Sequence, residues 1–168
     1  MGADHSRGLA GALYAKDVTL GAWEADMRAQ IKGEYTRQYL LGRGGRDQMT
    51  QADWGSIGGM LASQYRFLDK FAADIATGEL SEAQIAARSE LYLYSAKQAF
   101  EKANERARTS DTQVKWTMSA AEHCGDCESF ASLDWQPMAE DPFGGAHPGD
   151  GSTICKTNCK CHLEYKRQ

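Results

Sequence analysis

Apolar side chains recur every three or four positions through most of the first 110 residues, a spacing that predicts amphipathic helices. One such stripe lies within residues 20–39, a second within 54–75 and a third within 85–103. Proline, which would interrupt a helix, first occurs at Pro137. We therefore predict three long helices between residues 18 and 110, arranged as an elongated bundle or hairpin array.

Helix boundaries are also indicated by short-range signals. The spacing of a capping box occurs twice, in Thr50 with Asp53 and in Ser81 with Gln84. In this motif, the side chain of each residue accepts a hydrogen bond from the backbone N–H of the other. Gly78 is placed to end the second helix, and the glycines of residues 41–47 favour a turn after the first.

The pattern changes at both ends of the chain. Residues 1–17 show no sustained stripe, and we expect a flexible segment there. After residue 110, Val114, Trp116 and Met118 alternate with polar residues, which predicts a short strand. The expected organisation is therefore a flexible segment over 1–17, an elongated helical region over 18–110 and a cysteine-rich module over 111–168. The fold class is mainly α with a small C-terminal β or irregular module, α+β overall.

The candidate chemistry is concentrated in this last module. It contains all five cysteines of the 168-residue chain and all three prolines. Residues 116–155 carry seven acidic residues and neither Lys nor Arg, whereas the last stretch, 156–167, is basic. No run approaches the ~18 apolar residues that a membrane span needs, so no membrane partner is expected.

The cysteines have the spacing of a zinc site. Cys124 and Cys127 form a Cys-x-x-Cys pair, and Cys155, Cys159 and Cys161 follow after a loop rich in Gly, Pro and Asp. Two such clusters separated by a loop are typical of tetrahedral Zn²⁺ held by thiolates. We predict a structural Zn²⁺ site made by four of these five cysteines, with His123, His147 and His162 as weaker candidate ligands.

Other uses of the cysteines fit the sequence less well. Disulfides would leave one of the five cysteines unpaired. A redox Cys-x-x-Cys would need a thioredoxin-like strand and helix, which the pattern does not show. A catalytic zinc needs an open position beside a general base, and neither His-Glu-x-x-His nor the deaminase signature occurs. No catalytic residues are therefore assigned.

The order of these features resembles the phage Mu F-like minor head proteins, which act in head morphogenesis. "VKWTMSAAEHCGDC" is similar to the family's Trp-containing strand with Cys-x-x-Cys, and "ICKTNCKCHLEY" to its closing His-x-x-Cys-Arg-Cys and strand. The upstream helices also resemble the family's helical portion, so the resemblance covers roughly residues 18–165. Cys155, one residue further out, stands where the family has its closing histidine.

The resemblance implies a structural virion component rather than an enzyme. It implies a portal or inner-capsid protein as the partner, with packaged DNA as a weaker one. It also implies a place in the head or neck interior of the virion, and in the host cytoplasm during assembly. An oligomer is compatible with this role, and the copy number is left open.

Two other functions remain as alternatives. One is a zinc-stabilised nucleic-acid-binding module, which the basic stretch from Lys156 to Arg167 favours and the acidic loop disfavours. The other is a zinc-knuckle nuclease or hydrolase that uses Asp126, Glu128 and His147 as acids and bases.

Overall fold

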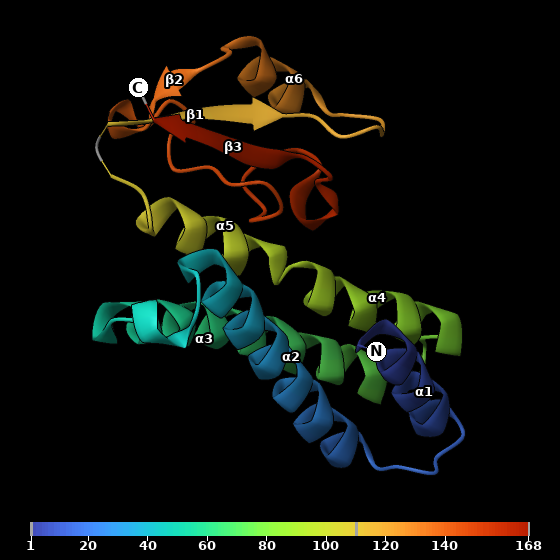
Figure 1. The fold of residues 1–168 in the computed structure, drawn as a ribbon. Coiled ribbons are helices and arrows are strands. Elements are labelled where there is room, and N and C mark those ends of the chain that lie inside the picture. Colours follow the sequence, from blue (N-terminus) through green and yellow to red (C-terminus); the bar gives the residue numbers. More distant parts are fainter. Residues whose placement is uncertain (1, 110, 168) are drawn as a thin grey trace. The chain divides into compact units, whose positions relative to one another are not determined.

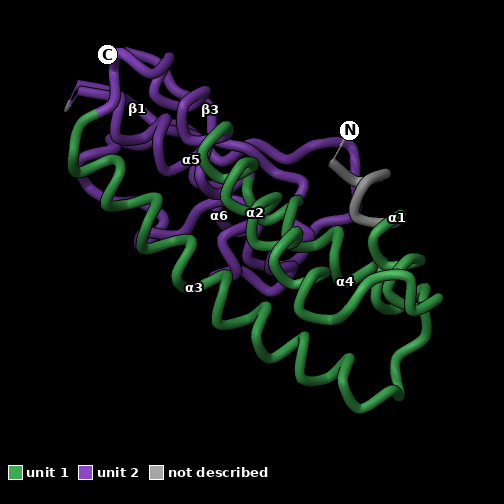
Figure 2. Tube along the Cα trace, turned by 90° about the horizontal axis from the view of Figure 1, so that it is seen from below, with its two compact units in different colours: residues 1–37, 50–96 green, residues 38–49, 97–168 purple. Residues whose placement is uncertain are grey.

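The structure, a computed structural model, describes residues 2–109 and 111–167 (Figure 1). The chain is mainly helical with a small three-stranded antiparallel sheet, which confirms the predicted α+β class. It divides into two compact units, residues 1–37 with 50–96 and residues 38–49 with 97–168 (Figure 2). The expected boundary near residue 110 falls inside the second of these units. Among the described residues, no helix has the length and apolarity that crossing a bilayer demands.

The first unit is built from helices: α1 (Gly2–Tyr14), most of α2 (Leu20–Arg43), α3 (Gln51–Ala76) and α4 (Glu82–Tyr94). The predicted stripes form its core. Trp23 of α2 meets Phe71 of α3 edge-on, with ring centroids 5.5 Å apart, and Phe71 stacks on Tyr92 of α4 at 6.2 Å. Apolar side chains on the α2 and α3 stripes are buried with them: Met27, Ile31, Tyr35, Ile57, Leu61 and Leu68.

Helix α1 occupies the segment that we expected to be flexible. It packs against α4, and Ala10 is fully buried. A Cβ on Gly11 would lie 3.1 Å from Glu82 Oε1, so the small residue suits the close contact. Gly8 and Gly11 lower the intrinsic helix propensity, and packing against a neighbouring helix compensates for this in a way that the local sequence does not reveal.

Both predicted capping boxes are present. The Thr50 amide donates to Asp53 Oδ2 at 2.9 Å, and the Ser81 amide donates to Gln84 Oε1 at 2.8 Å. The reciprocal bonds to the Thr50 and Ser81 hydroxyls complete each motif. Gly78 has a φ of 76°, as expected of a residue that ends a helix.

The prediction of a single third helix is wrong, because the helix is interrupted by a turn at Ser95 and Ala96, although Ser95 itself keeps a helical φ and ψ. The Ser95 hydroxyl donates to Tyr92 O at 2.8 Å and also bonds the buried Tyr35 hydroxyl at 2.9 Å. A serine side chain that bonds the backbone competes with the helical hydrogen-bond ladder. The helical chain resumes as α5 (Lys97–Arg106), which belongs to the second unit.

The second unit contains the sheet, in the order β2 (Gln136–Pro137), β1 (Thr112–Thr117), β3 (His162–Arg167). The predicted strand is thus confirmed as β1, although Met118 lies just beyond it and is exposed. Helix α6 (Gly125–Ser132) and the short 3₁₀ turns η1 (Arg46–Gln48), η2 (Met138–Glu140) and η3 (Lys156–Asn158) complete the unit. Its core is aromatic: Trp116 lies 4.9 Å from Phe130 and 5.4 Å from Phe143 between ring centroids.

A close backbone approach inside the second unit depends on Gly42. A Cβ added there would lie 2.4 Å from Phe100 O and 2.8 Å from Ala103 Cβ. Only glycine therefore lets the end of α2 lie this close to α5.

We predict that Gly42→Ala destabilises the protein by about 1–3 kcal/mol, because the new methyl group has backbone rather than a flexible side chain in its way. Gly33→Ala, in the same helix with no atom within 4 Å of its added Cβ, is the matched control. It should stabilise the protein by about 0.5–1 kcal/mol through helix propensity. Urea unfolding of both variants measures the difference, and equal effects would contradict the close approach.

Candidate metal centre

Five cysteine side chains gather at one place in the second unit. Cys124 is the N-cap of α6 and Cys127 lies in its first turn, so the three-residue spacing puts both on one side of the helix. Cys155 and Cys159 flank the turn η3, and Cys161 directly precedes β3. Two segments separated by about 27 residues of chain, counted from Cys127 to Cys155, therefore meet here.

The Cys127 sulfur is central to the cluster. It lies 3.6 Å from the sulfurs of Cys124 and Cys155 and 3.7 Å from that of Cys159. The cysteines are free thiols, and these separations far exceed a disulfide bond. Zn–S bonds of about 2.3 Å at tetrahedral angles place two sulfurs roughly 3.8 Å apart, so the observed spacing matches the edges of such a site.

The sulfurs form two groups that share Cys127. One group is Cys124, Cys127 and Cys155, and the other is Cys127, Cys159 and Cys161; within each, all sulfurs lie within 4.8 Å of one another. All five predicted cysteines are thus brought together, and the cluster has the donors to hold a metal ion. The restriction to four ligands stays a prediction.

The three histidines considered as ligands are placed differently. His123 adjoins the cluster, with Nδ1 3.4 Å from the Cys161 sulfur, while its Nε2 lies 2.6 Å from Ser119 O. His147 Nε2 is instead 2.7 Å from Glu105 Oε2, and His162 Nε2 lies 3.4 Å from Glu164 Oε1. Among the described residues, neither cysteine group includes a histidine within the 4.8 Å limit.

Burial and crowding control the charge on the thiols. Burial raises the pKa of Cys127 far above its ordinary value, and neighbouring thiols raise it further. Burial likewise raises the pKa of Cys155. The backbone N–H of Cys127 lowers the pKa of Cys124 to about 7, which is the effect expected at a helix N-terminus. Several thiolates can therefore coexist here only if a cation neutralises them.

Hydrogen bonds also join the cysteine-bearing segments. Asp126 Oδ2 accepts from the Ile154 amide at 2.8 Å, which ties α6 to the residue before Cys155. The Ser119 hydroxyl donates to Lys160 O at 2.6 Å, and the Lys97 ammonium donates to Cys161 O. These bonds hold the backbone of both segments in place around the sulfurs.

The three residues of the hydrolase alternative have different surroundings, and that alternative stays a prediction. No hydrogen bond joins His147 to Asp126 or Glu128 anywhere in residues 2–109 and 111–167. Asp126 accepts a hydrogen bond from the Ile154 amide, and Glu128 is exposed. His147 pairs with Glu105 of α5.

A set of buried titratable side chains lies on and around α5, and no pattern in the sequence predicted it. The hydrogen bond between His147 and Glu105 lowers the pKa of Glu105, and it raises the pKa of His147 although burial acts against this. Glu101, one helical turn earlier, is 1% exposed, and its Oε2 has no hydrogen-bond partner among the described residues. Burial raises the pKa of Glu101 to about 7, and the charges of Lys97 and His147, together with the Leu163 amide, only partly offset this. The four-residue spacing of Glu101 and Glu105 is common on solvated helix faces and gave no signal.

Comparison with known proteins adds no constraint. No family model, curated protein or solved structure matches the chain. The resemblance to phage minor head proteins therefore stays a prediction that depends on the residues quoted above.

We predict that Glu101→Gln stabilises the protein, and more so at high pH. The pKa of Glu101 is higher in the folded protein than in the unfolded chain, so the folded state binds the proton more tightly. The free energy of unfolding therefore falls as the pH rises from about 4.5 to about 7. The gain should be about 2–3 kcal/mol at pH 8 and below about 1 kcal/mol at pH 5. Urea unfolding at both pH values measures it.

The exposed Glu140, changed to Gln, is the control, and little change is expected at either pH. A gain for Glu101→Gln that does not depend on pH would show that lost packing or hydrogen bonding, rather than buried charge, determines the effect.

Proposed function

We propose that the cysteine cluster binds one structural Zn²⁺ that clasps α6 to the segment leading into β3. The observation that carries this proposal is the position of Cys127, whose sulfur lies 3.6–3.7 Å from three others contributed by both segments. Four thiolates form a closed tetrahedral site with no position for substrate. Soft sulfur donors without carboxylates favour Zn²⁺ over Mg²⁺ or Ca²⁺.

A metal clasp is what the second unit needs for stability. Its sheet has only three strands, one of them of two residues, and the connection between α6 and η3 contains little regular structure. Non-glycine residues with positive φ, Asp134 and Asp141, add conformational cost to that connection. Since the unfolded chain lacks a preformed site, the free energy of metal binding becomes free energy of folding.

At the level of the whole chain, we propose a structural minor head protein that acts in phage head morphogenesis by binding the portal or the inner capsid. The order of β1, the Cys-x-x-Cys at α6, an irregular loop, the closing cysteines and β3 supports this proposal, because it is the order in the signature that the sequence resembles. Five cysteines are more than enough to fill the four positions of a tetrahedral zinc site, which leaves no open position for a substrate and favours a non-enzymatic role.

The zinc proposal predicts one equivalent of Zn²⁺ in protein purified without added metal. Cys127→Ser should lose stoichiometric zinc, because it removes the sulfur common to both groups. Since five cysteines serve four positions, we expect at least one of Cys155→Ser, Cys159→Ser and Cys161→Ser to keep it. Elemental analysis of the variants measures this.

Chelation supplies the structural readout for the same proposal. Removing the metal should reduce the near-ultraviolet circular dichroism to which Trp116 contributes, because Trp116 packs in the same core as the buried cysteines. Metal-free wild-type protein, or full zinc in Cys127→Ser, would contradict the clasp.

The assembly proposal predicts that the chain co-purifies with a portal or inner-capsid protein when the phage or prophage genes are expressed together. Zinc-depleted protein should lose this association if the clasp shapes the binding surface. Absence of the chain from both purified virions and assembly intermediates would refute the head-protein role and leave the zinc site untouched.

A further inference from the structure

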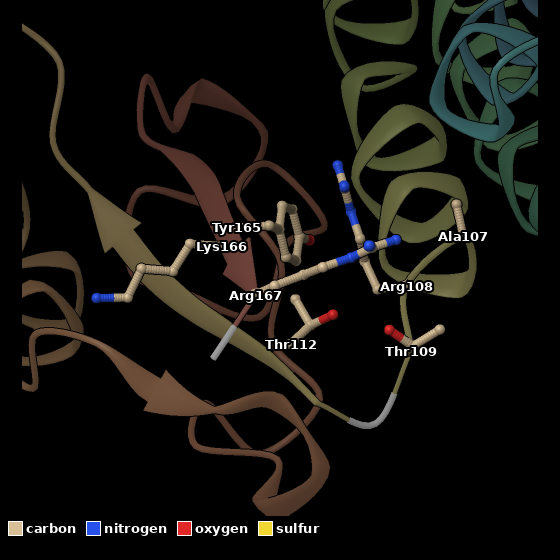
Figure 3. A pocket seen from close by; sticks show the side chains of 7 residues that line it. All are labelled: Ala107, Arg108, Thr109, Thr112, Tyr165, Lys166 and Arg167. Atoms are coloured by element: carbon tan, nitrogen blue, oxygen red, sulfur yellow. The ribbon is translucent and has the colours of Figure 1, made fainter.

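A small cationic pocket lies at one end of the sheet in the second unit (Figure 3). It has a volume of about 130 Å³, and it is lined by residues that directly follow α5, by the first residue of β1 and by the last residues of β3. The side chains that matter for binding are Arg108, Thr112, Tyr165 and Arg167. None of them belongs to the cysteine cluster.

The strand register creates this grouping. Thr112 pairs with Arg167 across β1 and β3, so their side chains emerge on the same face. Tyr165, two positions before Arg167, shares that face. Lys166 lies between them on the opposite face, and its ammonium points away from the pocket, 4.4 Å from the Trp135 ring centroid (Figure 3).

The two guanidinium groups are held in different ways. Arg108 lies over the Tyr165 ring at 4.7 Å and donates to Asn104 Oδ1 at 2.6 Å, which orients it and leaves other N–H groups available. The Arg167 guanidinium has no hydrogen-bond partner within residues 2–109 and 111–167. Both side chains belong to exposed residues, so a ligand can reach them.

Acidic side chains near the pocket oppose anion binding: Glu101 and Glu105 act on the Tyr165 hydroxyl, and Asp111 lies near Arg167. Asp111 is exposed, and Arg167 contributes to the lowered pKa of its carboxyl group, after the larger effect of the Thr109 hydroxyl. The pocket therefore contains two guanidinium groups and the Thr112 hydroxyl, against the Asp111 carboxylate near Arg167 and the Glu101 and Glu105 carboxyls that act on Tyr165.

We propose that this pocket binds a phosphate group. Two arginine forks present paired N–H donors that match the oxygens of phosphate, and a threonine hydroxyl supplies another donor. A volume near 130 Å³ accommodates one tetrahedral oxyanion and is small for a nucleoside. The source is either free phosphate or a phosphate of a nucleic-acid backbone, whose bases would stay outside the pocket.

The test titrates inorganic phosphate into the intact, zinc-containing protein at fixed ionic strength, followed by amide chemical shifts. Wild type should bind one equivalent saturably. Arg167→Gln and Arg108→Lys should each weaken binding roughly tenfold or more, the second because lysine keeps the charge and loses the fork. Asp111→Asn should tighten it.

Lys102→Gln is the matched control, since it removes an exposed positive charge from α5 without touching the pocket. Its affinity should stay within about twofold of wild type, as expected when an exposed charge acts only through solvent. Equal weakening by Lys102→Gln and Arg167→Gln, or no saturable binding by wild type, would overturn the proposal. Unchanged zinc content and urea midpoint show that each variant is folded.

A competition experiment distinguishes the two sources. If a fluorescent oligodeoxythymidine binds wild type and inorganic phosphate displaces it, while Arg167→Gln binds it more weakly, the pocket takes a backbone phosphate. If the oligonucleotide does not bind while inorganic phosphate does, the ligand is a free phosphate. Oligonucleotide binding that neither phosphate nor Arg167→Gln affects would count against the pocket as its site.

Discussion

The second unit depends on the convergence of cysteine sulfurs around Cys127. Burial makes a thiolate costly at this position, and crowding by other thiols adds to the cost. A bound cation reverses both effects, because it neutralises the sulfurs and bonds them directly. The same atoms that disfavour charge in the metal-free protein would thus become the strongest crosslink in a unit with a small sheet and a long irregular connection.

Side chains around the cysteine cluster also hydrogen-bond to the backbone of the cysteine-bearing segments. Asp126 binds the Ile154 amide, Ser119 binds Lys160 O and Lys97 binds Cys161 O. Such contacts hold the cysteine-bearing segments in place without a metal, which would reduce the entropy lost if one bound. Asp126, which the hydrolase alternative would use as an acid or base, accepts this bond from the Ile154 amide.

The parts of the fold that the sequence predicts are those determined by local patterns. The stripes on α2 and α3 and the capping boxes at Thr50 and Ser81 depend on residues within one or two helical turns, and the cysteine spacing needs only a loop between two turns. The failures are non-local. The helix ends at Ser95 partly because its hydroxyl meets Tyr35, sixty positions earlier, and α1 forms against α4. Glu101 shares its face of α5 with Lys97 and Glu105, a polar pattern that indicates solvent exposure, and its burial comes from contacts distant in sequence, such as the one with the Leu163 amide.

The buried carboxyl of Glu101 and the cysteine cluster both lie at the start of β3. Glu101 contacts the amide of Leu163, two positions beyond Cys161, and its ionisation is disfavoured by burial. A site that costs stability at neutral pH is tolerated only where other interactions hold the surrounding backbone. Cys161, Lys97 and the β1–β3 pairing supply those interactions at this end of β3, so the stability gained by binding a metal would offset the cost of the buried acid.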